Sequence, residues 1–229
     1  MLWKRLDRFL MGVLAALAMA AAIMADPAAS AGSAGAAAAA SADATSRHIS
    51  VRLHDYAGLD ETDLRDTQEQ VSEIYGAVGV VLDWRAAVRP DRVQAGLEGW
   101  PSDPPATLSV LIVTEDMARG IRIRDEVAGY AAVNPVGGGS VAFMVADRAR
   151  RIAMSARVGL PRIASSVIAH ELAHLLMPNR PHSHDGLMKA NWQPLDFRFS
   201  VSRAFSRAEA EIIRRGVARL ARETVRADN

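Results

Sequence analysis

The feature that most constrains this chain is a pair of histidines within an apolar segment. Residues 161–177 read PRIASSVIAHELAHLLM. A proline at the start and Pro178 after the end predict a helix over this range. On a helix, the i, i+4 spacing places His170 and His174 on one face, one turn apart. The neighbouring side chains are mostly apolar, so the helix should be buried and its two imidazoles need partners.

The two histidines form an H-E-x-x-H motif with Glu171. Two imidazole nitrogens one turn apart can bind a single metal ion, and zinc suits imidazole ligands. Glu171 lies about 100° around the helix from His170. There it can accept a proton from a water molecule without binding the metal. The composition gives a chance expectation of roughly 0.007 such motifs. The motif therefore predicts one zinc ion, with Glu171 as the catalytic general base.

The third zinc ligand is less constrained by the residues alone. His182, His184 and Asp185 all follow the predicted end of the helix, in the segment PHSHDGLM. A gluzincin would instead take a glutamate from a later helix, where Glu209 and Glu211 lie. Glu209 already occupies a capping-box position, which favours capping and a solvated face for these two residues over metal binding.

The run HELAHLLMPNRPHSHDGLMKANW, residues 170–192, resembles the signature of a group of exported bacterial zinc metalloproteases related to the metzincins. In that signature, H-E-L-x-H-L-L is followed by H-S-x-x-G-x-M-x-A-x-W. The resemblance implies that His170, His174 and His182 bind the zinc ion and that Glu171 is the general base. It also implies that Met188 is the Met-turn residue beneath the metal. The implied fold is a zincin or metzincin-like single domain.

The chain departs from the stricter metzincin pattern in the spacing of its third histidine. That pattern places glycine seven and histidine ten positions after the first histidine, where this chain has Met177 and Arg180. His182 comes two residues later. Pro178 and Asn179 can end the helix in place of glycine, and a longer turn can bring His182 back to the metal.

Apolar periodicity and turn residues predict the remaining elements. We expect a long surface loop from residue 85 to 107, rich in proline and glycine, and a hairpin-like reversal at Gly137–Gly139. This order predicts an α+β domain with one mixed, mostly parallel sheet, an active-site helix and a C-terminal helix. The predicted strands are 48–53, 78–84, 108–114, 127–133 and 140–145, and the predicted helices are 60–75, 161–177 and 205 to about 221.

The N-terminal residues are predicted to lie outside the fold. Residues 1–25 combine a basic head with an apolar run and small residues, which is typical of a secretory signal peptide. Residues 26–46 are an Ala/Ser/Gly-rich flexible linker, and 47–229 are the catalytic domain. The protein is expected to be exported, either periplasmic or secreted. It would contact a membrane only if residues 1–25 stayed attached as an anchor.

Composition excludes several classes of function. The chain has no cysteine, so disulfides, thiolate metal sites, cysteine nucleophiles and cysteine-switch latency are all excluded. Its 27 basic and 26 acidic side chains are balanced and only 5% of its residues are aromatic. This composition lacks the positive charge and the stacking groups that nucleic-acid binding requires.

The sequence thus predicts a zinc-dependent hydrolase that acts on a peptide or protein substrate, as an endopeptidase rather than an exopeptidase. Two alternatives stay open: an exported zinc-binding or structural module without hydrolytic activity, and a zinc amide hydrolase acting on cell-wall peptides. Tyr130 is a conceivable oxyanion helper, although a buried strand tyrosine fits the pattern better. His48 and His54 are expected to be strand residues. The resemblance further suggests that 129–133 forms the upper rim of the cleft, where an extended peptide could add as a strand.

Overall fold

The computed structural model describes residues 48–88, 107–133, 140–198 and 201–227. By its internal contacts the chain divides into residues 1–39 and 40–229, and every described residue belongs to the second unit. The predicted signal peptide, the linker, the reversal at Gly137–Gly139 and most of the long loop lie outside the described residues. Within the described ranges, no helix is long and apolar enough to span a membrane.

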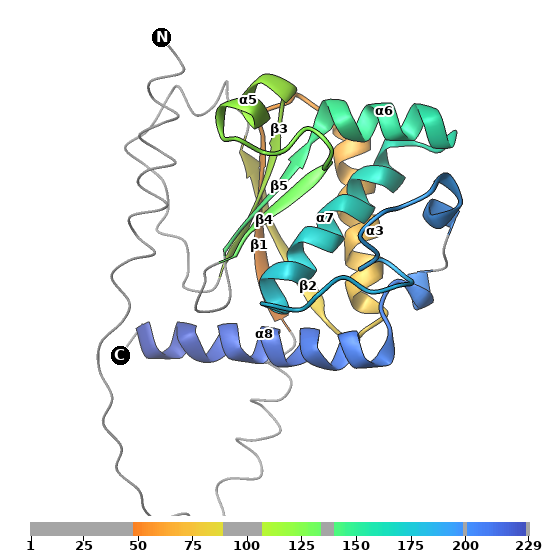
Figure 1. Cartoon of the computed structure of the whole chain (residues 1–229). Coiled ribbons are helices and arrows are strands. Elements are labelled where there is room, and N and C mark those ends of the chain that lie inside the picture. Colours follow the sequence, from red (N-terminus) through yellow and green to blue (C-terminus); the bar gives the residue numbers. More distant parts are fainter. Residues whose placement is uncertain (1–47, 89–106, 134–139, 199–200, 228–229) are drawn as a thin grey trace, which may run out of the picture. The chain divides into compact units, whose positions relative to one another are not determined.

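All strands lie in the first half of the described residues, together with two helices, and only helices follow them (Figure 1). Their bounds are β1 (His48–Asp55), α3 (Glu61–Gly76), β2 (Val81–Val88), β3 (Leu108–Val113), α5 (Glu115–Gly120), β4 (Gly129–Ala132), β5 (Val141–Val145), α6 (Ala146–Ala156), α7 (Leu160–Leu176), the 3-10 helices η1 (Pro194–Arg198) and η2 (Val201–Arg203), and α8 (Arg207–Ala227).

The five strands form one sheet in the order β2-β1-β3-β5-β4. The pairs β1/β2, β1/β3 and β3/β5 are parallel, whereas β4 runs antiparallel to β5 at the edge of the sheet. The predicted α+β class with a mixed, mostly parallel sheet is therefore confirmed. The antiparallel edge strand also contacts the helix that carries the H-E-x-x-H motif.

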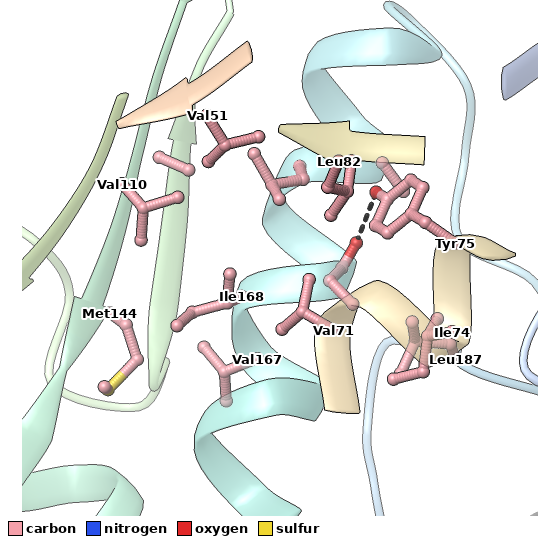
Figure 2. Close-up of a cluster of buried hydrophobic side chains, with 14 of the residues drawn as sticks. Val51, Val71, Ile74, Tyr75, Leu82, Val110, Met144, Val167, Ile168 and Leu187 are labelled. Carbon is pink, nitrogen blue, oxygen red and sulfur yellow. Dashed lines mark hydrogen bonds between the residues drawn. The ribbon is translucent and has the colours of Figure 1, made fainter. Parts of the chain in front are cut away.

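The core lies between the sheet and helices α3 and α7 (Figure 2). Val51, Val110 and Met144 project from three different strands toward Val167 and Ile168 of α7. Val51 and Val110 are fully buried, as strand residues that alternate toward a covered face should be. This packing fixes α7, and with it the two motif histidines, against the sheet.

Helix α3 contributes a second anchor for α7. The hydroxyl of Tyr75, a fully buried residue, donates a hydrogen bond to the carbonyl oxygen of Ala169 at 2.9 Å (Figure 2). Ala169 directly precedes His170 in the chain. The bond therefore joins the two helices immediately beside the first motif histidine.

Helix α7 begins and ends close to its predicted bounds, with proline in its first turn as expected. It ends at Leu176, and Asn179 then adopts a left-handed conformation with φ +62°. Asparagine tolerates this conformation better than most residues because its short side chain can bond locally. The prediction that Pro178 and Asn179 end the helix in place of glycine is confirmed.

The sequence pattern missed helices α5 and α6 and misplaced several bounds. Strand β2 continues to Val88, so the first residues of the predicted long loop belong to a strand. Strand β4 is shorter than predicted, and α8 runs six residues past its predicted end. Helix α6 buries alanines at 146, 149, 153 and 156, a helical spacing that could have identified it. The side chains are small, so the periodicity carries little hydrophobic signal.

Helix α8 begins with the predicted capping box. The backbone N–H of Ser206 donates to Glu209 Oε2 at 2.7 Å, and the N–H of Glu209 donates to Ser206 Oγ at 3.3 Å. Further along, Gly216 lies against the end of α7, where an added Cβ would overlap the carbonyl oxygen of Leu176. Glycine is required there because the two helices approach so closely.

Candidate metal centre

The structure brings three imidazoles from two segments together. His170 and His174 project from α7, and His182 returns from the loop that follows it. Their Nε2 atoms are separated by 3.0 Å (170 to 174), 3.2 Å (170 to 182) and 3.2 Å (174 to 182). Three nitrogens bound tetrahedrally to zinc at about 2.0–2.1 Å are roughly 3.3–3.4 Å apart. The spacing of the three nitrogens is therefore close to that of a zinc site.

The ring of His170 is oriented by its other nitrogen. Nδ1 lies 2.7 Å from the carbonyl oxygen of Leu187, an atom that can only accept, so Nδ1 carries the proton. Nε2 of a neutral ring then presents a lone pair toward the other two histidines. Trp192 Nε1 donates to the same carbonyl at 3.2 Å, and its indole packs edge-on against His170. A metal-binding histidine commonly has this kind of support for its second nitrogen.

Burial keeps two of these imidazoles uncharged. The pKa of His170 is lowered to about 3, mainly by desolvation; the hydrogen bond to the Leu187 carbonyl opposes this shift, and His174 and His182 add to it. Desolvation, followed by the charge of His182, lowers the pKa of His174 to about 4. At neutral pH both rings are therefore neutral and can offer lone pairs. The three Nε2 atoms are close enough to offer one ligand atom each to a single ion, so the donor set fits a metal ion.

Glu171 lies on the buried side of α7 toward the edge strand. Burial raises the pKa of its carboxyl to about 8. A Cβ added at Gly129, the first residue of β4, would lie 2.6 Å from Glu171 Oε1 and 2.7 Å from its Cγ. The carboxylate is therefore held between α7 and the start of β4. Glu171 follows His170 in the sequence but is not a member of the three-histidine group. A carboxylate in an apolar setting is a stronger base than an exposed one.

Tyr130 faces away from this carboxylate. It follows Gly129 on β4, and successive side chains of a strand point to opposite faces. Its ring packs against Phe143 at 6.3 Å between centroids, and half of its surface is exposed. The expectation of a buried strand tyrosine is thus right about the strand and wrong about burial. Its orientation does not favour a role as an oxyanion helper.

The other candidate ligands lie elsewhere. His184 and Asp185 are exposed and do not belong to the three-histidine group, the one metal-compatible group among the described residues. Glu209 is buried and bonded to two serines, and Glu211 is exposed and paired with Arg215. The geometry therefore favours His182 as the third ligand and does not support the gluzincin arrangement.

The segment after His182 is tied down by backbone contacts. The N–H of Ser183 donates to the carbonyl of Met188 at 2.8 Å, and that of Leu187 donates to Ala204 at 2.7 Å. Gly186 has φ +74°, and an added Cβ would lie 2.8 Å from the Ala204 oxygen. Met188 is almost fully buried within this turn. Its placement is compatible with a Met-turn, and that role stays a prediction.

The start of β4 is held by Arg148 of α6, a residue that the sequence did not single out. Its buried guanidinium bonds bidentately to Glu115, with a shortest distance of 2.7 Å. It also donates to the carbonyls of Arg124 and Val127. These two residues lie in the segment between α5 and β4. Arg148 thereby fixes the chain that leads to Gly129.

Sequence reasoning placed Gly129 on the predicted rim strand through the resemblance but did not predict its contact with Glu171, although a glycine inside a strand often marks a close approach. It identified His48 and His54 correctly as strand residues, since both lie on β1. Nδ1 of His48 lies 3.2 Å from Asp83 Oδ2, and burial lowers the pKa of His54 to about 4. Neither joins the histidine cluster.

Fold and site together define an α+β domain in which an H-E-x-x-H helix and a following loop bring three imidazoles together. No family model matches the chain. No curated protein matches it. Among solved structures it is similar to archaemetzincin from Methanopyrus kandleri, with 18% identity and a TM-score of 0.45, covering 75% of this chain and 96% of that chain.

Proposed function

We propose that this chain is a zinc-dependent peptidase. His170, His174 and His182 would hold one zinc ion, and Glu171 would be the catalytic general base. The observation that carries the proposal is the convergence of three Nε2 atoms within 3.2 Å of one another, together with a buried carboxylate on the residue that follows the first histidine. His182 is exposed, so the cluster opens to solvent on one side, as a catalytic metal site requires.

The residues support hydrolysis of an amide bond by an activated water molecule. Zinc, when bound, would polarise the substrate carbonyl and lower the pKa of a water molecule. The Glu171 carboxylate accepts a proton from the attacking water and then delivers it to the leaving amine nitrogen. A neighbouring divalent cation favours the ionised carboxylate against the effect of burial, so that Glu171 can act as a base near neutral pH.

The edge strand β4 supports a peptide as the substrate. Its outer edge is not paired with any other described strand, and its first residue contacts Glu171. An extended peptide that adds to this edge would pass beside the carboxylate. Such a mode needs no free peptide terminus, which supports an endopeptidase. Both proteins and cell-wall peptides contain the amide bonds that this chemistry cleaves.

A purely structural zinc site is the less favoured reading. Structural zinc sites are closed by four protein ligands, whereas the described residues bring three together. Such a site would also have no use for a buried glutamate next to its first ligand.

Export to the periplasm or the medium remains part of the proposal and rests on the composition of residues 1–25.

Zinc content and peptide hydrolysis of purified variants test this function. We expect one zinc per chain in the wild type and little in His182→Ala. His184→Ala is the matched control, since it removes an exposed imidazole two residues away and should retain zinc. Glu171→Gln should keep zinc while hydrolysis of a peptide library falls to background.

Each outcome decides a different part of the proposal. Zinc retained in His182→Ala and lost in His184→Ala would move the third ligand. Full hydrolysis by Glu171→Gln would remove Glu171 as the general base. Absence of zinc from the wild type after loading with excess metal would refute the peptidase. A wild type that binds zinc but cleaves neither peptides nor cell-wall fragments would favour the non-catalytic module.

A further inference from the structure

The third histidine of the cluster lacks the rigid support that the first two have. His170 and His174 lie on a helix packed against the sheet, whereas His182 is exposed and lies in a segment without helix or strand. A single isolated bridge joins Ser183 to Lys189 in this segment. A loop residue that must meet two fixed nitrogens needs a tether from another element, because ordering a loop costs conformational entropy.

Glu209 supplies such a tether from α8. Its side chain is buried, with only 2% of the residue exposed. Oε1 accepts a hydrogen bond from the hydroxyl of Ser183, the residue directly after His182. Oε2 accepts the backbone N–H of Ser206 at 2.7 Å. Both oxygens of this buried carboxylate are therefore used, one in the helix cap and one on the loop.

Helix α8 is in turn fixed to the helix that carries the other two histidines. Gly216 lies directly against the carbonyl of Leu176, the last residue of α7. Arg219 donates to the carbonyl of Leu175 at 3.5 Å, and Val217 is buried. Figure 1 shows the end of α7 meeting α8. Helix α8 therefore contacts both the loop that carries His182 and the helix that carries His170 and His174.

We propose that Glu209, acting through Ser183, is a positioning residue that holds His182 in register with His170 and His174. The inference rests on the proposed zinc site and adds a function to a capping residue that is 35 positions away from the motif in sequence. Charge-assisted bonds to a buried carboxylate are stronger than neutral ones. The bond therefore limits the positions that His182 can sample before metal binds. Part of the conformational entropy that the loop would lose on metal binding is already lost on folding.

Ser183→Ala in the full chain is the direct test, because it removes the loop contact and leaves the cap of α8 intact. The matched control is Ser206→Ala, which removes the Ser206 Oγ acceptor of the same capping box and leaves the Ser183 bond in place. Ser183→Thr keeps the hydroxyl. Zinc affinity is measured by competition with a chromophoric chelator, and coordination by the visible absorption of cobalt in place of zinc.

We expect Ser183→Ala to weaken zinc binding by on the order of tenfold and to alter the cobalt spectrum. Ser183→Thr and Ser206→Ala should bind zinc like the wild type, although Ser206→Ala should unfold more easily. In a His182→Ala background, Ser183→Ala should have no further effect on metal affinity, because the residue through which it acts is gone.

The results separate this inference from the function on which it rests. Zinc affinity unchanged in Ser183→Ala, in a wild type that does bind zinc, would overturn the positioning role and leave the peptidase standing. An equal loss of affinity in Ser206→Ala would show a general effect of helix stability and would also overturn it. Failure of the wild type to bind zinc would remove the proposed function itself.

Discussion

Gly129→Ala should separate catalysis from metal binding. An alanine Cβ at this position would lie 2.6 Å from Glu171 Oε1, 2.7 Å from Glu171 Cγ and 2.7 Å from Val167 Cγ1. Favourable contacts between non-bonded atoms lie at about 3.5–4.0 Å. Either β4 or the carboxylate must therefore move by on the order of 1 Å. Neither movement requires a shift of the three imidazoles, because β4 carries none of them and the carboxylate can move by rotation of the Glu171 side chain alone.

The expected magnitude follows from this displacement. Overpacking of this kind lowers the free energy of unfolding by about 1–3 kcal/mol. Misplacement of a catalytic group by about 1 Å can reduce the rate by about 100-fold. We therefore expect kcat to fall by roughly that factor, equivalent to about 2.7 kcal/mol in the activation free energy. Zinc content should stay at the wild-type level.

Steady-state hydrolysis of a peptide substrate and elemental analysis measure the two effects. Gly159→Ala is the matched control, since it lies just before α7 and its added Cβ would meet only Pro161, at 3.7 Å. It should be as active as the wild type. Wild-type kcat in a folded Gly129→Ala protein would refute the reasoning, because Glu171 would then tolerate the displacement. Loss of zinc would equally refute the claim that the effect is confined to the carboxylate.

Three further predictions concern stability. Arg148→Met should lower the free energy of unfolding by about 3 kcal/mol in urea titrations, because it leaves Glu115 and two carbonyls without their buried partner. A loss below about 1 kcal/mol would contradict this reasoning. The bond from Arg148 lowers the pKa of Glu115 to about 2, so the stabilisation by this ion pair is complete above pH 4.5 and is lost as the pH falls toward 2. The difference in free energy of unfolding between wild type and Arg148→Met should therefore narrow over that range. A difference that stays constant with pH would exclude the ion pair as its source. Tyr75→Phe should lower the free energy of unfolding by about 1–2 kcal/mol in thermal or urea unfolding, because the bond to the Ala169 carbonyl is lost. An unchanged free energy of unfolding would show that this buried carbonyl has another hydrogen-bond partner.

The candidate ligands were predictable because they lie close together in sequence. His170 and His174 are related by the helical repeat alone, and a buried helix follows from the apolar residues around them. His182 needed the resemblance, since spacing could not distinguish it from His184 or Asp185. The structure brings His182 into the cluster and leaves the other two exposed.

The supporting residues were not predictable, because they come from distant positions. Gly129 contacts Glu171 across 42 positions of sequence, and Arg148 fixes the approach to Gly129 from another helix. Glu209 was correctly expected to cap α8 from its local pattern, but its second oxygen binds a loop 26 residues away. Local patterns identify a cap or a strand glycine, whereas only tertiary packing decides what else these residues touch.

The two extra residues before the third histidine explain why a tether is needed here. With histidine ten positions after the first, the chain could leave the helix and return by a short turn. In this chain Arg180 occupies that position, and Asn179 redirects the backbone with φ +62° before His182 approaches the cluster. A longer turn has more conformations to lose, so its geometry depends more on outside contacts. The bond between Ser183 and Glu209 therefore lies where the departure from the shorter spacing would otherwise leave the third ligand least constrained.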